Sequence, residues 1–371
     1  MPFSVLITTN RLDIGGAETH VVTLARHLKE IGHRVALASA GGRYVVDLEG
    51  YGIPHYPVPL DSNRLGDIYC SVVELRKIID REGIGLIHAH ARIPAMTCDL
   101  ARRGRGIPLV TTAHGRFKTP LHLRLLSRWG DKTIAISPDI RDYLLSSYWL
   151  SPQNITLIPN GIDLDLFNPA IEPEELALAG GTLRIAYFSR LDGPLTRVAL
   201  NLIEAFLHIC PDFPGLRLLL GGEGSGASEV LARVNEINHG CGTELVRFLG
   251  AVPLVNRVMV ASDLVVGVSR VALEGMACAR NVMLAGGEGF GGIVHPEALK
   301  ELAGDNFTGR SLPNQATTSL LEASLREFLN TPADERARVA GLLRQFVVDN
   351  YGSRQMVEET VRVYETALRG G

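Results

Sequence analysis

Short apolar runs alternate with amphipathic helical segments along the chain, and this alternation constrains the fold more than any single motif. Apolar runs rich in β-branched residues, such as residues 3–9, are typical of strands buried on both faces. Residues 17–30 carry an apolar face at helical spacing, from Val21 to Leu28. Because strands separated by helices form parallel sheets, the pattern predicts a doubly wound α/β fold. The strands predicted in the first half are residues 3–9, 35–39, 85–89, 109–113 and 132–136.

The alternation stops after Asn160 and then begins again. The segment "NGIDLDLFNPAIEPEELALAGG" is rich in Pro, Gly and acidic residues, and we interpret it as a domain boundary. Two domains also suit a chain of 371 residues. We place them at residues 1–165 and 166–350, with residues 351–371 carrying a last helix that belongs to neither sheet. The strands predicted in the second half are residues 183–188, 216–222, 245–250, 263–268 and 281–286.

Composition and charge narrow the class of protein. A net charge of −3 does not favour nucleic acid as the main partner. No basic stretch precedes an apolar core at the N-terminus, and no run reaches the roughly eighteen apolar residues of a membrane span. The five cysteines form no CxxC pair and are expected to be buried and reduced. We expect a cytoplasmic protein, and peripheral contact with the inner face of a membrane stays open.

Glycines and polar residues gather in the loops after the predicted strands, where open α/β sheets bind their ligands. Gly15 and Gly16 follow the first strand and open a helix, whose free amides attract anions. Glycine lets those amides approach a phosphate closely, although a flexible loop is the alternative interpretation. The other residues in such loops are His88 and His90 in "HAH", His114 in "TTAHG", Asn160 in "IPNG", Ser189 and Arg190 in "YFSR", and Glu274 in "LEGMA".

The order of these motifs resembles that of the retaining GT-B glycosyltransferases known as glycosyl transferases group 1, over essentially the whole chain. The resemblance implies two Rossmann-like domains facing a cleft, an acceptor-side first domain, a donor-binding second domain and a C-terminal helix that crosses back to the first. It implies transfer of a hexosyl or N-acetylhexosaminyl group from a nucleotide-diphosphate sugar to a carbohydrate or glycolipid acceptor. The family's common use is cell-envelope synthesis, and the resemblance implies neither a metal nor another cofactor.

The resemblance also implies roles for individual residues. His114 matches the family histidine that contacts the donor sugar near the reacting carbon, and Glu274 matches the glutamate that binds the ribose hydroxyls. Arg190 matches the arginine that neutralises the diphosphate leaving group, for which a permanently charged, bidentate guanidinium is suited. His114 and Arg190 are therefore the expected catalytic residues. Other expected donor-binding residues are Gly15, Gly16, Ser189, Arg197, Gly222, Gly289 and Gly291, and the acceptor side is expected to include His88, His90, Arg92 and Asn160.

The chain departs from the family pattern at two positions. Leu195 stands where the family usually has a lysine, and Arg197 is the candidate replacement. Val266 stands where the family usually has its first glutamate. A literal "EGFG" at residues 288–291 follows the next predicted strand, so it is not the same element, although its glycines could offer amides to the donor. Nucleotide binding is therefore better supported than recognition of the donor sugar.

Several patterns admit other chemistry. The stretch "GGEGSGA" at residues 221–227 fits a loose dinucleotide fingerprint, which we interpret as a tight turn beside the nucleotide. We interpret "DLD" at residues 163–165 as a solvated turn rather than a metal-binding motif. His88, His90 and His114 could form a zinc set, but no nearby acid or cysteine completes it, and we interpret them as polar residues without a metal.

Three alternatives stay open. Residues 116–132 could form a basic helix on an anionic membrane, although packing of its leucines on the sheet is the preferred interpretation. A sugar-nucleotide epimerase or hydrolase of GT-B shape would need carboxylates as acid and base. A non-catalytic nucleotide-sugar-binding protein would suit the missing lysine and glutamate. Transfer of a sugar to a second molecule separates these classes.

Overall fold

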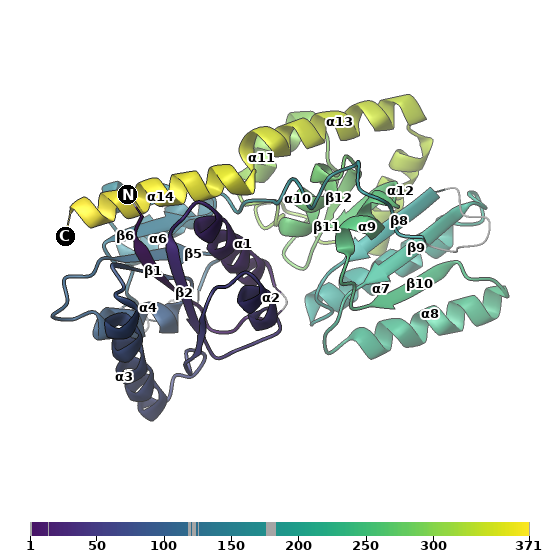
Figure 1. The fold of residues 1–371 in the computed structure, drawn as a ribbon. Helices are drawn as coiled ribbons and strands as arrows, with labels where there is room; N and C mark the ends of the chain where they lie inside the picture. The colour runs from purple at the N-terminus through teal and green to yellow at the C-terminus, as the bar shows by residue number, and fades with distance from the viewer. Residues whose placement is uncertain are drawn as a thin grey trace. The chain divides into compact units, whose positions relative to one another are not determined.

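The computed structural model describes residues 2–13, 15–117, 120, 124, 126–175 and 183–370. The chain divides into two compact units, each with its own sheet (Figure 1). The first unit comprises Met1–Gly161 and Ser353–Gly371, and the second comprises Ile162–Gly352.

The first unit is built on a seven-stranded parallel sheet in the order β3-β2-β1-β4-β5-β6-β7. All five strands predicted for this half are present, and β3 and β7 extend the sheet at its edges. The central strands are buried on both faces, which explains their continuous apolar runs. The strands are β1 (Ser4–Thr8), β2 (Arg34–Ser39), β3 (His55–Pro57), β4 (Leu86–Ala89), β5 (Leu109–Ala113), β6 (Lys132–Ala135) and β7 (Ile155–Leu157).

Helices between these strands cover the sheet. The helices described before residue 162 are α1 (Gly16–Glu30), α2 (Val45–Gly50), α3 (Leu65–Glu82), α4 (Arg92–Ala101), α6 (Pro138–Tyr148) and the 3-10 turn η1 (Pro152–Asn154). Within residues 116–132, where a leucine-rich helix is expected, residues 118, 119, 121–123 and 125 lie outside the described residues. Residues 127–130 are described and are not helical, and Leu126 is 52% exposed, so the expectation that the leucines pack on the sheet is wrong for Leu126. The carbonyl of Trp129 accepts hydrogen bonds from the Thr111 and Thr133 hydroxyls at 2.8 Å each.

The C-terminal helix α14 (Ser353–Arg369) belongs to the first unit although it ends the chain (Figure 1). Its apolar face, which includes Val357 and Tyr364, joins the same core cluster as Val5, Leu24 and Val110. The expected return of this helix to the first domain is therefore confirmed.

The second unit carries a six-stranded sheet in the order β10-β9-β8-β11-β12-β13. Its first five strands are parallel, as predicted, and β13 runs antiparallel to β12. The sequence did not predict β13. A parallel partner needs a crossover of a dozen or more residues, whereas residues 286–289 allow only a hairpin. The strands are β8 (Leu183–Phe188), β9 (Leu216–Gly221), β10 (Val246–Gly250), β11 (Leu264–Gly267), β12 (Asn281–Ala285) and β13 (Phe290–Ile293).

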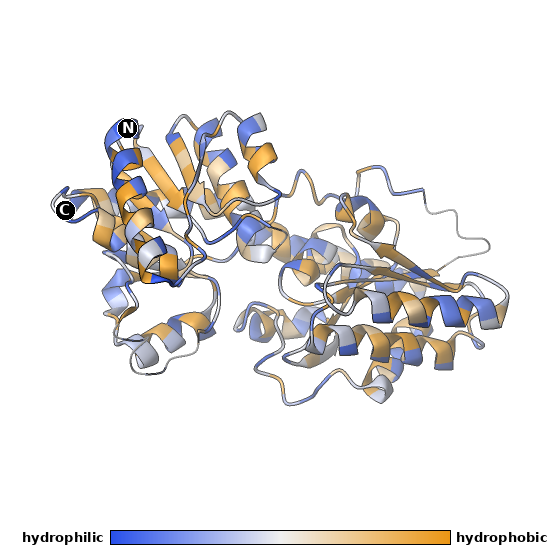
Figure 2. Ribbon diagram, turned by 90° about the horizontal axis from the view of Figure 1, so that it is seen from below, coloured by the Kyte–Doolittle hydropathy of each residue, from blue (hydrophilic) through white to orange (hydrophobic). Residues whose placement is uncertain are grey.

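Two apolar cores pack against the faces of this second sheet. Ile185 and Tyr187 of β8 join one core, whereas Ala186 and Phe188 join the other, because successive side chains of a strand point to opposite faces. Figure 2 shows apolar residues along the strands and mixed faces on the helices. The helices are α7 (Pro194–Ile209), α8 (Ala227–Cys241), α9 (Val255–Val260), α10 (Arg270–Ala277), η2 (Pro296–Ala298), α11 (Leu299–Ala303), α12 (Thr318–Asn330) and α13 (Ala333–Asn350).

The five cysteines differ in how far they are exposed. All five cysteines are free, but only Cys98 and Cys278 are buried. Cys70 on α3 and Cys241 at the end of α8 are exposed, so the expectation that the cysteines are buried is wrong for these two. Among the helices of the described residues, none has the length and apolarity that a membrane crossing requires.

Candidate active site

Three histidines meet at the carboxyl end of the first sheet. His20 comes from α1, His90 follows β4, and His114 follows β5, the neighbour of β4 in the sheet. His90 Nδ1 lies 3.0 Å from His114 Nε2. The His20 ring centroid lies 5.4 Å from that of His90 and 4.9 Å from that of His114. We call His20, His90 and His114 the histidine cluster.

His20 is the residue of this cluster that the sequence analysis missed. It is 3% exposed, although it lies on the first turns of a surface helix. The sequence did contain a signal for His20: it lies four residues after Gly16, in "GGAETH". Residues four apart share a helix face, so the spacing was enough to place His20 on the same face as Gly16.

His88 lies beneath the cluster rather than in it. It is fully buried, and its ring is stacked obliquely on that of His90 with centroids 4.0 Å apart. His88 Nδ1 lies 2.6 Å from the Tyr364 hydroxyl on α14, and Nε2 lies 2.7 Å from the Thr112 hydroxyl on β5. Both ring nitrogens of His88 are therefore engaged by groups inside the first unit.

Burial keeps the imidazoles of His88, His90 and His114 neutral at pH 7. It lowers the pKa of His88 to about 3 and that of His114 to about 4, and the nearby His114 adds to the effect on His88. The pKa of His90 falls well below its usual value through burial and then through the neighbouring histidines. His88, His90 and His114 therefore offer hydrogen-bonding nitrogens but no positive charge at pH 7, so these three rings do not attract a phosphate by charge.

Gly15 and Gly16 lie at the start of α1, on the same helix as His20. Gly15 is the N-cap, and its carbonyl accepts hydrogen bonds from the amide and hydroxyl of Thr19 at 2.9 and 2.8 Å. Its φ of 179° is ordinary extended backbone, and a Cβ at this position would first meet the end of the flexible Glu18 side chain. Glycine at position 15 is thus not demanded by backbone strain.

The two other predicted acceptor-side residues lie on separate elements. Arg92 opens α4, with its guanidinium 4.8 Å from the centroid of the Phe117 ring and 3.0 Å from the Tyr148 hydroxyl. Asn160 is buried after β7, and its Oδ1 has no hydrogen-bond partner within the described part of the chain.

In the second unit, the loops after β8 and β9 are bound to each other. Leu191 donates its amide to the Glu223 carbonyl at 2.8 Å, and the amide and hydroxyl of Ser225 each bond Asp192 Oδ1 at 2.8 Å. These Ser225 bonds, and then the charge of Arg190, lower the pKa of Asp192. Arg190 itself is exposed at the end of β8, beside this pair of loops.

Gly222 is required by the approach of the two loops. It has a φ of 154°, and a Cβ there would stand 2.0 Å from the Ser189 carbonyl oxygen. We expect Gly222→Ala to lower the free energy of unfolding by about 2–3 kcal/mol, through strain and loop displacement. Urea unfolding measures this, with Gly240→Ala as the matched control, because open space surrounds Gly240 near the end of α8. Equal effects of both substitutions would contradict the close approach.

Glu274 lies on α10 and is 7% exposed. Its Oε1 forms an ion pair with Arg270 Nε at 2.6 Å. Burial raises the pKa of Glu274 above its usual value, and Arg270 opposes that shift. Because a carboxylate accepts up to about four hydrogen bonds, the pair leaves acceptor capacity on Glu274.

The departures from the family pattern have structural explanations. Val266 is fully buried in β11, so a core side chain occupies the place of the family's first glutamate. Leu195 lies in the first turn of α7, and its carbonyl accepts a hydrogen bond from the Tyr187 hydroxyl at 3.1 Å. Arg197 is exposed two residues later on the same helix.

The "EGFG" stretch forms the end of the β12–β13 hairpin. A Cβ at Gly289 would stand 1.9 Å from the Gly309 carbonyl oxygen, and one at Gly291 would stand 3.0 Å from the Leu284 side chain. Packing within the unit therefore accounts for glycine at both positions.

The "DLD" stretch is a turn, but the expectation that it is solvated is wrong for Asp163. That residue is 7% exposed, and its Oδ1 accepts the amides of Asp165 and Leu166 at 3.1 Å each. Its carboxylate is thus used to close the turn.

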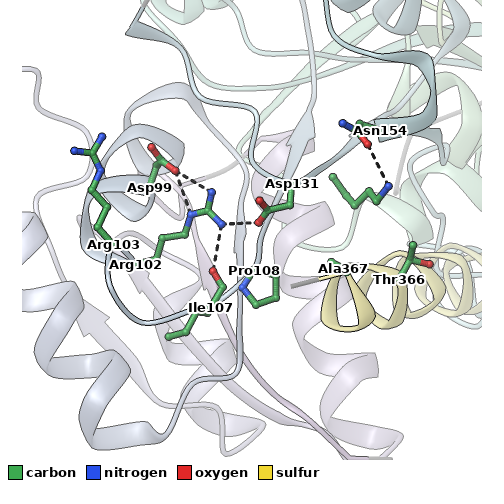
Figure 3. Close-up of a pocket in the computed structure, with 12 residues that line it drawn as sticks. Asp99, Arg102, Arg103, Ile107, Pro108, Asp131, Asn154, Thr366 and Ala367 are labelled. Carbon is green, nitrogen blue, oxygen red and sulfur yellow. Dashed lines mark hydrogen bonds and ion pairs between the residues drawn. The ribbon is translucent and has the colours of Figure 1, made fainter.

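A cavity of about 580 Å³ lies at the amino ends of β5 and β6, where Leu109 and Lys132 begin these strands. Figure 3 shows Arg102 between Asp99 and Asp131, which its guanidinium contacts at 3.0 and 2.5 Å. Arg102 is thus paired with both carboxylates, and the opposite end of a parallel sheet is the usual ligand side. We therefore assign the site to the carboxyl ends.

Comparisons with known proteins agree with this fold. Residues 14–166 match the model of Glycosyltransferase Family 4. The chain is 25% identical over 259 residues to a phosphatidylinositol N-acetylglucosaminyltransferase chain of Arabidopsis thaliana, and the match covers 65% of this chain and 56% of that protein. The chain thus spans about half the length of this relative and of its human and Schizosaccharomyces pombe counterparts.

Solved structures extend the likeness to the whole chain. A glycosyltransferase from Rickettsia africae superposes with a TM-score of 0.79 at 20% identity, covering 100% of both chains. The Anabaena protein HepE in complex with UDP and glucose superposes with a TM-score of 0.76 at 18% identity, covering 98% of this chain and 99% of HepE. The predicted fold class, two Rossmann-like units of GT-B type, is confirmed.

Proposed function

We propose that this chain is a retaining glycosyltransferase that moves a hexosyl or N-acetylhexosaminyl group from a nucleotide-diphosphate sugar to an acceptor hydroxyl. The observation that carries the proposal is the pair of bonded loops after β8 and β9. These loops place the exposed Arg190 beside Gly222, at the edge of the sheet where such folds bind ligands. The match to Glycosyltransferase Family 4 and the GT-B fold support it.

Arg190 is assigned to the donor diphosphate. Negative charge builds on the diphosphate as the sugar leaves, and a fixed guanidinium stabilises that charge more in the transition state than in the bound substrate. An arginine in this role replaces the divalent cation that other transferases use, so the proposed reaction is independent of metal at the diphosphate. Arg197, which is exposed near the start of α7, is the second candidate cation.

Glu274 is assigned to the ribose, because its carboxylate keeps acceptor capacity beyond its bond with Arg270. His114 is neutral and is assigned a hydrogen bond to the donor sugar rather than a charge interaction. The acceptor hydroxyl is assigned to the first unit, beside Gly15 and Gly16. Its proton passes to the leaving phosphate oxygen, which needs no protein base.

The acceptor is proposed to be a carbohydrate or glycolipid of the cell envelope. A relative named for phosphatidylinositol supports a lipid-linked acceptor. The epimerase alternative is less favoured, because the described strand ends of the first unit bring together histidines rather than the two carboxylates that acid–base work on a sugar would use.

A thermal-shift panel of nucleotides and nucleotide sugars, with and without Mg²⁺, tests the donor assignment. A ligand at a hundredfold excess over its dissociation constant stabilises the native state by about 2.7 kcal/mol. We expect a metal-independent rise in melting temperature with one base, which is lost in Arg190→Ala and Glu274→Ala. The matched control is Arg338→Ala, an exposed arginine on α13. A shift that requires Mg²⁺, or no shift with any nucleotide, would contradict the proposal.

A further inference from the structure

A buried ion pair lies on α10, in the second unit. Arg270 Nε lies 2.6 Å from Glu274 Oε1, and the two side chains are 13% and 10% exposed. We propose that Arg270 is a positioning residue for the donor ribose: it holds the Glu274 carboxylate ionised and aligned, so that the carboxylate accepts hydrogen bonds from the ribose hydroxyls. This inference deepens the proposed function and rests on it, because Glu274 is assigned to the ribose there.

The pair lies at the end of the sheet to which the donor is assigned. β11 ends at Gly267 and α10 begins at Arg270, so Arg270 follows the carboxyl end of its strand. The neighbour of β11 in the sheet is β8, after which Arg190 follows. A Cβ at Gly267 would stand 3.6 Å from the Phe188 carbonyl oxygen, so the ends of these two strands lie side by side. Arg270 and Arg190 therefore belong to the same end of adjacent strands.

The direction of the pair is not the one that stabilises a helix. A helix gains most when the acidic residue precedes the basic one by four positions, because the partial positive charge of the helix lies at its N-terminus. Here the arginine is the first residue of α10, and the glutamate follows four residues later. A buried ion pair is also weak evidence for stability, because the cost of removing both charges from water offsets their attraction. Helix stability thus does not explain the pair, whereas a need for a charged carboxylate does.

The turn that leads into Arg270 is strained. Ser269, the N-cap of α10, has a φ of 52° and a ψ of −119°, and its side chain makes no capping hydrogen bond to the helix. The Ser269 amide instead donates to the Phe307 carbonyl at 2.7 Å, and Asn306 Nδ2 donates to Ser269 Oγ at 2.9 Å. A residue other than glycine keeps such a conformation only where its surroundings enforce it, and such residues cluster at ligand sites. The bonds to residues 306 and 307 thus fix where Arg270 begins the helix.

The charge that acts on Glu274 is that of Arg270. Burial raises the pKa of the Glu274 carboxyl, and the charge and hydrogen bond of Arg270 lower it. Cys278 follows one turn later, and burial, with the charge of Glu274, raises the pKa of its thiol to about 12, so this thiol is neutral at pH 7. Without Arg270 the effect of burial is unopposed, and Glu274 takes up a proton at a higher pH.

Two charged residues on helices packed against α10 are engaged elsewhere than with Glu274. Arg344 of α13 donates a hydrogen bond to the Ala277 carbonyl. Arg257 of α9 forms ion pairs with Glu172 and Glu174 at 3.6 Å each. The strands beneath α10 contribute buried apolar side chains to the same core. Arg270 is thus the charged residue through which the chain controls the ionisation of Glu274.

Calorimetric titration of the full chain with UDP, GDP and ADP, each beside its 2′-deoxy form, tests the proposal between pH 5.5 and pH 9. The ratio of the two affinities, which we call the ribose preference, reports the contact with the carboxylate, because the two ligands differ only in the 2′-hydroxyl. We expect the original protein to bind one of these nucleotides with a ribose preference of about tenfold or more at pH 7, the usual effect of one hydrogen bond to a charged group. Glu274→Gln should lose this preference at every pH.

Removal of the Arg270 charge should raise the pH at which the ribose preference is lost. A carboxylate with a raised pKa is protonated as the pH falls through that higher value, and a protonated carboxyl has fewer acceptor sites. In Arg270→Leu the preference should therefore be lost at pH 6.5 and should recover towards pH 9. Arg270→Lys keeps the charge and should restore the preference at pH 6.5. Arg270→Gln is a second neutral variant, so the test does not depend on the folding of the leucine variant.

Arg326→Leu is the matched control, because it breaks a pair with Glu322 at the same spacing on α12, and it should behave as the original protein does. A ribose preference with the same pH profile in the original protein and the neutral variants would overturn the role of Arg270 and leave the proposed function in place. A loss that does not depend on pH would also overturn it, because it would indicate a structural role alone. If the original protein binds no nucleotide, the proposed function fails, and this inference fails with it.

Discussion

Arg190→Ala is expected to lower the rate of sugar transfer by about 10²–10³-fold, which corresponds to about 3–4 kcal/mol of transition-state stabilisation. The side chain is exposed at the end of β8, so its removal should leave the fold intact. Because charge on the diphosphate grows during the reaction, kcat should fall more than KM rises. The measurement is the rate at which nucleoside diphosphate is released. The substrate is the sugar nucleotide that raises the melting temperature in the thermal-shift panel.

Arg190→Lys refines this expectation. Lysine keeps the charge but loses the planar fork that binds two phosphate oxygens, so an intermediate rate is expected. Arg338→Ala again serves as the control, and its rate should match that of the original protein. A rate in Arg190→Ala within twofold of the original would remove Arg190 from the mechanism and leave the diphosphate without its assigned cation.

Acid is expected to destabilise the first unit through its buried histidines. The pKa of His88 is about 3 in the folded protein and about 6.5 in an unfolded chain. A lowered folded pKa gives a stability contribution that is present above pH 6.5 and is lost as the pH falls towards 3. From His88 alone, the free energy of unfolding should fall by about 3 kcal/mol between pH 6.5 and pH 4, and His90 and His114 add to this.

Urea unfolding at pH 7, 5.5 and 4 measures this loss. His88→Gln removes the titrating ring, so the variant should be less stable at pH 7 but should lose less stability on acidification. His239→Gln, an exposed histidine in the second unit, should leave the pH dependence unchanged. Equal pH slopes for the His88→Gln and original proteins would show that His88 does not carry the expected linkage.

Most of the parallel strands could be predicted because they are short apolar runs buried on both faces, whereas β10 was predicted although it is only partly buried. Val5, Leu6 and Ile7 of β1 are all fully buried, so no polar residue interrupts the run. β3 and β7 were missed because these edge strands are short and partly exposed. β13 was missed because its glycines, Gly291 and Gly292, weaken any strand pattern.

The histidine cluster shows where prediction from the sequence ends. His88 and His90 look alike in "HAH", yet β4 ends at Ala89, and the two rings have different partners. His20 lies 70 positions before His90 in the sequence. Whether His20 reaches His90 depends on how α1 packs on the sheet. No local sequence pattern predicts that packing.

The sequence by itself determined the order of strands and helices, the parallel pairing within two units, and the set of polar residues at the strand ends. These follow from local periodicity and from the rule that parallel strands need crossovers. Only the tertiary structure decided that His20 replaces His88 in the cluster, that Arg270 pairs with Glu274, and that the loops after β8 and β9 are bound together. The physical reason is distance: hydrogen bonds and ion pairs form within about 3 Å, and chain separation does not fix which side chains come that close.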